Sequence, residues 1–239
     1  MRAPPPRRPL SLCASPPHHH HLLLFASPAA AACRRPPAVA RSVSVSTAVE
    51  APTAAAEPAR EDAAAAAPRR RLILLRHGES AAGGRFTRDH DRPLSKAGRA
   101  AAISVSNKLQ QMGWIPDLVL CSDATRTKET LRIFQEHVKG LSEAIVHFIP
   151  SFYSIAAMDG QTAEHLQKAI CEYSSDEILT VMCMGHNKGW EEAASMFSGD
   201  SVVLKTCNAA LLEAEGKSWV EAFSLAGLGG WKFHGIVKP

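Results

Sequence analysis

The first part of this 239-residue chain has no acidic residues. Residues 1–49 contain no Asp, no Glu and no Lys, yet they carry six arginines among serine, proline and alanine. An acid-free amino terminus rich in Arg and Ser is typical of an organelle transit peptide. We therefore predict a transit peptide at 1–49. The Ser, Ala and Pro content favours the chloroplast stroma as its destination, with the mitochondrion as second choice.

Long apolar runs are also lacking at this end. The run at 22–25, LLLF, is much shorter than the roughly 20 residues that span a bilayer. A secretory signal needs a longer unbroken apolar segment. Residues 50–70 are rich in Ala, Pro and Glu, which predicts a disordered spacer. We expect no membrane partner and a single folded domain at 71–239.

The predicted domain lacks an excess of positive charge. It holds 18 basic and 19 acidic residues, a net of −1, whereas residues 1–70 carry a net of +5 from nine arginines and four acids. We therefore expect no nucleic-acid partner. The four cysteines of the domain include no Cys-x-x-Cys pair, which favours ordinary buried thiols, although a redox-regulated pair remains open.

Buried strands alternate with helical segments along the domain, and this predicts an α/β fold. Short apolar runs predict strands at 71–76, 117–122, 144–149 and 177–184. Helical periodicity predicts helices from the N-cap Ser95 to Gly113, at 125–138, at 161–173 and after Asn187. Residues 209–212 and 219–223 around Glu215-Gly216-Lys217 predict a hairpin. We expect a three-layer sandwich in which helices cover both faces of a mostly parallel sheet.

Phosphate-seeking side chains follow three of these strands. Arg76 and His77 end the first strand, Arg126 follows the second within 122–126, and His186 ends a later one. Neighbouring parallel strands end at the same edge of a sheet, where open α/β sheets bind ligands. Guanidinium groups hold phosphate by paired hydrogen bonds, and a neutral imidazole can attack phosphorus. The sequence therefore predicts a phosphate-binding pocket that contains a nucleophile.

The three motifs together resemble the histidine phosphatase superfamily, which includes the phosphoglycerate mutases. Arg76-His77-Gly78, the Ser-x-x-x-Arg-x-x-x-Thr stretch at 122–130 and Gly185-His186-Asn187 carry the resemblance, with Asp91-Arg92-Pro93-Leu94-Ser95-x-x-Gly98 as a further match. It extends over 71–239. The compact size is most similar to the short bacterial phosphohistidine phosphatases, and the expected fold is phosphoglycerate mutase-like.

The resemblance implies a role for each matching residue. His77 would attack phosphorus and become a phosphohistidine, and water would then release phosphate. Arg76 and Arg126 would hold the phosphoryl oxygens, and a protonated His186 would stabilise the developing charge. No metal and no cofactor are implied, because the arginines supply the positive charge. The expected partner is a small phosphorylated substrate or a phosphoprotein.

The carboxylic acid that many superfamily members use to protonate the leaving group has no clear counterpart. Residues 150–159 contain no Glu, and Asp159 is their only acid; a plain loop role for it is favoured over that of an acid. Glu79 could act as an acid, but ordering the loop is favoured. Mutases also carry an Asn where this chain has Gly83-Gly84. A nitrogen leaving group needs a general acid less than an alkoxide does, so the sequence favours a phosphoramidate such as phosphohistidine, or an ester whose leaving group needs little help.

Several alternatives remain open. Arg85, Arg88 and Arg92 form a possible substrate loop, or they are solvated cations. The tail at 227–233 either covers an edge strand or binds a partner. For the whole protein, the main prediction is a phosphatase acting through His77. The alternatives are a non-catalytic protein that binds phosphate or phosphoproteins and, less favoured, a phosphoglycerate mutase.

Overall fold

A single mixed sheet forms the centre of the domain. The structure is a computed structural model that describes residues 67–85 and 87–239, so the predicted transit peptide and most of the predicted spacer lie outside the described residues. The strand order is β3-β2-β4-β1-β5-β6, parallel from β3 to β1 and antiparallel at β5 and β6. The strands are β1 (Arg69–Arg76), β2 (Leu118–Cys121), β3 (Ile145–Phe148), β4 (Thr180–Gly185), β5 (Ala209–Glu215) and β6 (Lys232–Val237).

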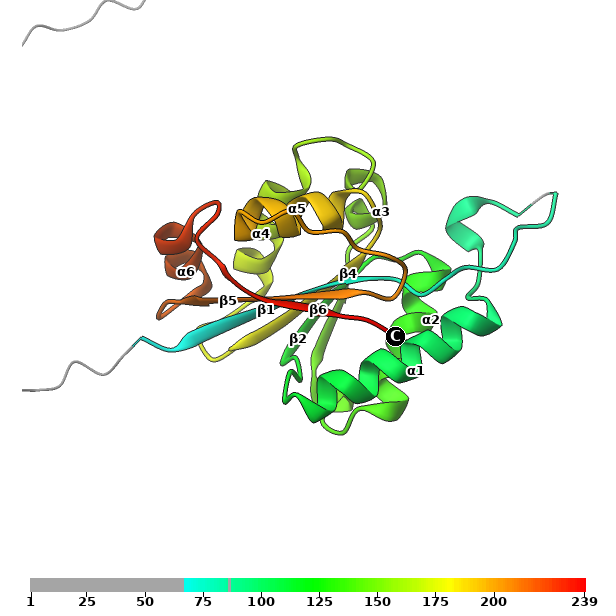
Figure 1. Ribbon diagram of the computed structural model, residues 1–239, viewed down its shortest axis with the longest axis horizontal. Helices are drawn as coiled ribbons and strands as arrows, with labels where there is room; N and C mark the ends of the chain where they lie inside the picture. Colours follow the sequence, from blue (N-terminus) through cyan, green and yellow to red (C-terminus); the bar gives the residue numbers. More distant parts are fainter. Residues whose placement is uncertain (1–66, 86) are drawn as a thin grey trace, which may run out of the picture. The chain divides into compact units, whose positions relative to one another are not determined.

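Helices cover both faces of this sheet, which confirms the predicted three-layer sandwich (Figure 1). α1 (Lys96–Gln111) and α2 (Thr125–His137) lie on one face. The opposite face carries α3 (Ser151–Ile155), α4 (Thr162–Tyr173), α5 (Gly189–Ser198) and α6 (Trp219–Ala226). Among the described residues, none of these helices combines the length and apolarity needed to cross a bilayer.

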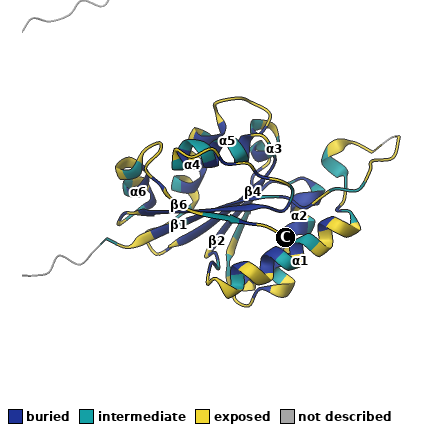
Figure 2. Ribbon diagram, viewed as in Figure 1, coloured by how far each residue is buried: buried dark blue, intermediate teal, exposed yellow. Residues whose placement is uncertain are grey.

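Strand β1 shows how the sequence divides the core in two. Its side chains alternate between the faces, so Leu72 and Leu74 pack with α3–α6 while Ile73 and Leu75 pack with α1 and α2. All four are fully buried, as a central strand requires. Figure 2 shows the middle of the sheet largely in the colour of buried residues. Cys121, Cys183 and Cys207 are also buried and Cys171 is half-buried, all four as free thiols.

The first strand begins at Arg69, before the predicted domain boundary at 71. Arg70 is buried, and four backbone carbonyls satisfy its guanidinium: those of Asp176, Ile178, Gly216 and Lys217. A charged side chain is not expected in a core, so the sequence pattern placed it in the spacer. The hydrogen bonds offset the cost of burying the charge and fasten the start of β1 to the loops beside it.

The predicted hairpin at 209–212 and 219–223 is wrong. Residues 209–215 form β5 as expected, but the second segment is helix α6, and β5 pairs with β1 and β6. Ser218 caps this helix by accepting a hydrogen bond from the amide of Glu221, and Trp219, Ala222 and Phe223 follow at helical spacing on its buried side. A Ser-x-x-Glu start preceding an apolar run is a helix-capping signal, and it outweighs the hairpin that was predicted around Glu215-Gly216-Lys217.

The carboxyl-terminal tail covers a sheet edge, one of the two alternatives that the sequence left open. β6 pairs with β5, and Trp231 is buried just before it. The amide of Gly229 donates to the carbonyl of Met196 at 2.8 Å, which holds the connection against α5.

Two glycines allow the loop after β1 to lie against the start of α1. A Cβ on Gly98 would overlap with the backbone of Glu79, and a Cβ on Gly78 would lie 2.9 Å from the carbonyl oxygen of Gly98. The amide of Ser95 also donates to the Glu79 carbonyl at 2.8 Å. This close approach fixes the backbone directly after His77.

We expect Gly98→Ala to lower the free energy of unfolding by about 1–3 kcal/mol, because the added methyl group must displace the Glu79 backbone. Urea unfolding measures the effect. Gly83→Ala is the matched control: the nearest atom to its Cβ is 3.5 Å away on the flexible Arg92 side chain, so it should change stability little. Equal effects of the two substitutions would contradict this account of the close approach.

Candidate active site

The strand register brings the three predicted motifs to one edge of the sheet. Arg76 at the end of β1 pairs with Gly185 at the end of β4, and Cys121 at the end of β2 pairs with Met184. The side chains that follow these strand ends therefore meet. All four predicted catalytic and phosphate-binding residues line one open cavity of about 370 Å³: Arg76, His77, Arg126 and His186.

His77 presents the lone pair of Nε2 to this cavity. Its Nδ1 lies 2.6 Å from the carbonyl oxygen of Gly78, which can only accept, so the proton of the neutral ring is on Nδ1. Nε2 in turn accepts a hydrogen bond from Nε of Arg126 at 3.1 Å. The backbone thus fixes the tautomer that leaves Nε2 free of a proton, as a nucleophile requires.

Burial is the main reason that the pKa of His77 is lowered to about 4. The hydrogen bond to the Gly78 carbonyl opposes this shift, and the positive charges of Arg126 and Arg76 add to it. A protonated ring would be a cation beside two guanidinium groups in a poorly solvated place. His77 is therefore neutral at neutral pH.

The spacing of the second motif explains how α2 holds Arg126 and the loop after β1. Arg126 and Thr130 are four residues apart on the helix and lie on the same side. The hydroxyl of Thr130 donates to the Arg126 carbonyl at 2.7 Å and accepts from the amide of Gly78 at 3.1 Å. This bridge ties the backbone beside His77 to the helix that carries the guanidinium.

His186 lies next to His77, with ring centroids 4.9 Å apart. Nη2 of Arg126 is 3.4 Å from its Nδ1, and Nε2 is 2.8 Å from the hydroxyl of Ser122. Because Arg only donates, the ring proton is assigned to Nε2. Burial, then the neighbouring His77 and Arg126, lower the pKa of His186 to about 2. The negative charge of Asp89 opposes this shift without reversing it. His186 is therefore neutral here, in contrast to the protonated ring that was expected.

Arg76 is half-buried, and its guanidinium is partly satisfied. Nη1 donates to the carbonyl of Leu204 at 2.8 Å, whereas Nε is buried without a partner among the described residues. Burial lowers the pKa of Arg76, with Glu191 opposing the shift. A carboxylate oxygen of Glu191 accepts from the amide of Leu204, and so it helps to place the carbonyl that holds Arg76.

The residues predicted with less support have different positions. Glu79 lines the cavity and accepts from the hydroxyl of Ser95 at 2.7 Å, in keeping with a loop-ordering role. Arg92 lines the cavity too, whereas Arg88 is exposed and paired with Asp91, and Arg85 is exposed. Asp159 is exposed in the turn after α3 and is not among the residues that line this cavity.

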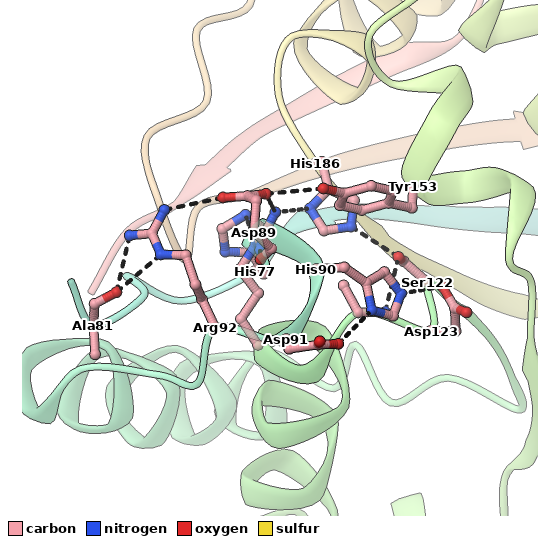
Figure 3. Close-up of polar contacts among 12 residues, drawn as sticks. His77, Ala81, Asp89, His90, Asp91, Arg92, Ser122, Asp123, Tyr153 and His186 are labelled. Carbon is pink, nitrogen blue, oxygen red and sulfur yellow. Dashed lines mark hydrogen bonds and ion pairs between the residues drawn. The ribbon is translucent and has the colours of Figure 1, made fainter. Parts of the chain in front are cut away.

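Two residues that the sequence did not single out reach the same place. Figure 3 shows the carboxylate of Asp89 between Arg92 and the phenol of Tyr153, above His77. Tyr153 also meets His186 edge-on, with ring centroids 5.2 Å apart. Tyr153 belongs to α3, within the stretch searched for a carboxylic acid. The sequence therefore indicated this region, but we expected a carboxylic acid there and not a phenol.

The opposite pKa shifts of two histidines give a measurable pH dependence. We expect the imidazole C–H signals of His77 in NMR spectra to stay in the neutral form from pH 7.5 down to about 5, because burial lowers its pKa to about 4. The signals of His90 should titrate above 6.5, because hydrogen bonds to Asp123 and Asp91 raise its pKa. His77→Asn identifies the first set of signals.

The stability of the fold should also depend on pH, because the pKa of His77 is lower in the folded protein than in the unfolded chain. Between about pH 6.5 and 4 the unfolded chain binds a proton at His77 and the folded protein does not, so acidification through this window destabilises the fold. A titration of His77 at or above pH 6.5 would contradict the electrostatic description of the site.

Comparisons with known proteins agree with this geometry. Residues 72–169 match the model of the histidine phosphatase superfamily, branch 1. A protein of Arabidopsis thaliana that is named as uncharacterised and chloroplastic is 66% identical over 164 residues, which cover 69% of this chain and 75% of that protein. The fold is similar to that of a protein assigned as the phosphohistidine phosphatase SixA in Nakamurella multipartitia. The TM-score is 0.59 at 24% identity, over 73% of this chain and 98% of the other.

A protein histidine phosphatase SixA in complex with tungstate is similar as well. Its TM-score is 0.55 at 19% identity, over 71% of this chain and 97% of the other. The family is named for its phosphatases, which supports phosphatase activity in general terms, and the two solved structures share the fold. The strand-end motifs lie at one cavity, and this chain covers 75% of the length of the Arabidopsis relative. The chain therefore belongs to branch 1 of the histidine phosphatase superfamily.

Proposed function

We propose that this protein is a phosphatase that transfers a phosphoryl group to His77 and then to water. The observation that carries the proposal is the tautomer of His77. The Gly78 carbonyl holds the proton on Nδ1, so Nε2 bears a lone pair beside the guanidinium of Arg126. A neutral imidazole with an oriented lone pair, surrounded by phosphate-binding donors, suits nucleophilic attack on phosphorus.

The reaction has two steps. In the first, Nε2 of His77 forms a bond to phosphorus while the bond from phosphorus to the leaving group breaks, and the leaving group keeps the electron pair and takes a proton from solvent. In the second, water attacks phosphorus, the bond to Nε2 breaks and the electron pair returns to the ring. The released water proton passes to solvent or phosphate, and inorganic phosphate leaves.

Arg76 and Arg126 would hold the phosphoryl oxygens in both steps. Their guanidinium groups are fixed positive charges, so the proposed reaction needs no metal ion. His186 would join them as the charge builds up. Its Nδ1 faces Arg126 as an acceptor, and a phosphoryl dianion beside it would favour protonation of that nitrogen, which turns it into a donor.

Phosphohistidine or another substrate with an undemanding leaving group fits this site best. Asp89 and Tyr153, the two further residues that lie near His77, are poor proton donors at neutral pH. Burial opposes ionisation of Asp89, but hydrogen bonds from Arg92, Tyr153 and Arg126 outweigh it and lower the pKa to about 2. Burial and the hydrogen bond to Asp89 raise the pKa of Tyr153, away from the value that suits a general acid. The SixA neighbours, named as phosphohistidine phosphatases, support the same substrate class.

One contact favours the alternative of a protein that binds phosphate without turnover. Nε of Arg126 covers the lone pair of His77 at 3.1 Å, and it must turn to the phosphoryl group before attack. The same lack of a strong proton donor weighs against a phosphoglycerate mutase, because its sugar-acid leaving group is an alkoxide.

A labelling assay tests the proposal directly. The whole protein, in buffer that contains a chelator, is mixed with a phosphohistidine peptide or an aryl phosphate, quenched in alkali and digested. We expect the mass of one phosphoryl group on the peptide that contains His77, and a loss of turnover by at least about a thousandfold in His77→Asn. His147→Asn, on the edge strand β3, is the control that should retain turnover. Binding without labelling or turnover would favour the non-catalytic alternative.

A second arm of the assay tests the leaving-group argument. Without a proton donor, kcat/KM should fall by about 10²–10⁴ from an aryl phosphate to an alkyl phosphate. Tyr153→Phe should leave that ratio unchanged, and so should Asp159→Asn. Similar rates for the two substrates, or a ratio that depends on Tyr153 or Asp159, would reveal a general acid and overturn the preference for phosphoramidates.

We further propose import into the chloroplast stroma. The acid-free leader at 1–49 and the name of the Arabidopsis relative support the chloroplast. A fluorescent protein fused after residues 1–70 should enter the chloroplasts of a plant cell, and stromal fractions should contain its shortened form. Accumulation in mitochondria would select the second choice, and cytosolic fluorescence would contradict import.

A further inference from the structure

The carboxylate of Asp89 receives the donors that a phosphoryl group would need. Nη2 of Arg126 and the phenol of Tyr153 donate to Oδ2 at 2.9 and 3.0 Å, and Nη1 of Arg92 donates to Oδ1 at 3.0 Å. The backbone carbonyl of Asp89 accepts from Nη1 of Arg126 at 2.5 Å. Figure 3 shows the carboxylate between Arg92 and Tyr153, beside His77.

Arg126 shows most clearly that Asp89 and a phosphoryl group would compete for the same hydrogen-bond donors. Its Nε donates to His77, Nη1 donates to Asp89, and Nη2 donates to Asp89 and, at 3.4 Å, to His186. A guanidinium has five N–H groups, so four of them are directed to partners within the protein. A phosphoryl group that takes two N–H groups of Arg126 must displace at least one internal partner, and Asp89 receives two of the four N–H groups in use.

We propose that Asp89 is an internal anion of the phosphate pocket, which a substrate must displace and which thereby determines which anions enter. The inference rests on the proposed function, since it concerns the same pocket. A carboxylate carries one negative charge, and the phosphoryl group of a monoester or phosphoramidate carries up to two. Since attraction to the guanidinium groups grows with charge, a dianion displaces the carboxylate, whereas a monoanion such as a phosphodiester does not.

No residue of the turn that carries Asp89 is fully buried, so its release would uncover little apolar surface beyond the edge contact between the rings of His90 and Tyr153. Asp89 belongs to a short 3-10 turn, Asp89–Asp91, that has no buried residue. The side chain of Asp89 is 54% exposed and that of Arg88 is 82% exposed. Polar contacts hold the turn, including the hydrogen bond from His90 to Asp123 at 3.0 Å. Contacts to exposed partners cost little on exchange with water. Those to the buried Arg126 are not exchanged with water, because the phosphoryl group takes them over.

Farther down, the base of this loop is firmly attached. The amide of Ala81 donates to the Pro93 carbonyl at 2.8 Å, and Ser80 and Leu94 form an antiparallel bridge. Arg92 adds two hydrogen bonds to the carbonyl of Ala81. A displaced Asp89 would therefore stay close to the pocket, where it repels any second negative group on the substrate.

Calorimetry with inorganic phosphate tests the proposal on the whole protein at constant ionic strength. We expect Asp89→Asn and Asp89→Ala to bind phosphate about fivefold or more tightly than the unchanged protein, a size typical of coupling between two competing contacts. Asp91→Asn is the matched control. It removes the same charge from the same turn, but Asp91 pairs with Arg88 and His90 outside the phosphate donors, so its affinity should stay close to that of the unchanged protein.

A second probe and a second readout separate displacement from simple charge repulsion. Dimethyl phosphate, a monoanion, should bind the two Asp89 variants but not the unchanged protein. In the unchanged protein, phosphate should speed the hydrogen exchange of backbone amides in the 81–93 peptide, because the turn is released. Unchanged phosphate affinity in both Asp89 variants, or slower exchange of this peptide with phosphate, would overturn the proposal.

The outcomes also separate this inference from the proposed function. If phosphate binds the unchanged protein, is lost in Arg126→Ala and is unaffected by both Asp89 substitutions, the pocket stands and the role of Asp89 is refuted. If none of these proteins binds phosphate, the pocket itself fails and the proposed function falls with it.

Discussion

Repulsion among cationic groups is the constraint that governs this site. Two guanidinium groups and two imidazole rings lie around one cavity, with the rings of His77 and His186 4.9 Å apart. In a poorly solvated place such a group of charges is costly unless some are neutral or an anion joins them. Both solutions are present: burial keeps the imidazoles neutral, and the carboxylate of Asp89 lies on Arg126. In the proposed function, a phosphoryl dianion would meet the same need more fully.

The sheet supplies the positions that this balance requires. Parallel pairing of β4 with β1 and β2 puts the three motif ends side by side. The backbone around them is then fixed from several directions. The amide of Cys207 donates to the His77 carbonyl at 2.9 Å, and the amide of Arg76 donates to the Asn208 carbonyl at 3.0 Å. The segment Cys207–Asn208, just before the antiparallel strand β5, thus holds the end of β1 in place, although it contributes none of the motifs.

Those parts of the fold with strong local signals could be predicted from the sequence. The apolar runs that became β1, β2 and β4 are buried on both faces, and Ser95 caps α1 as expected by accepting from the amide of Gly98. Because strand ends and parallel pairing follow from this pattern, the gathering of His77, Arg126 and His186 was predictable too. α6 was missed because its aromatic residues suit either a strand or a helix, and the capping residues decide between them.

Asp89 and the protonation of His186 could not be read from the sequence. Asp89 reaches the pocket because its loop folds back over the strand ends, and that path depends on tertiary contacts such as those of Arg92 with Ala81. No periodicity or motif spacing encodes them. The charge of His186 depends on burial next to His77 and Arg126, so the protonated ring that the resemblance implied is not the form present here.

The position of Asp89 also accounts for the chemistry that this pocket lacks. A carboxylate that balances cations must be ionised, and a carboxylic acid that protonates a leaving group must hold a proton. One residue cannot do both at neutral pH when three donors lower its pKa to about 2. Tyr153 lies in the region where a general acid was sought, and its phenol donates a hydrogen bond to this same carboxylate. In the proposed function the nearest acid would serve charge balance, and a leaving group would have to take its proton from solvent, which a nitrogen base does far more readily than an alkoxide.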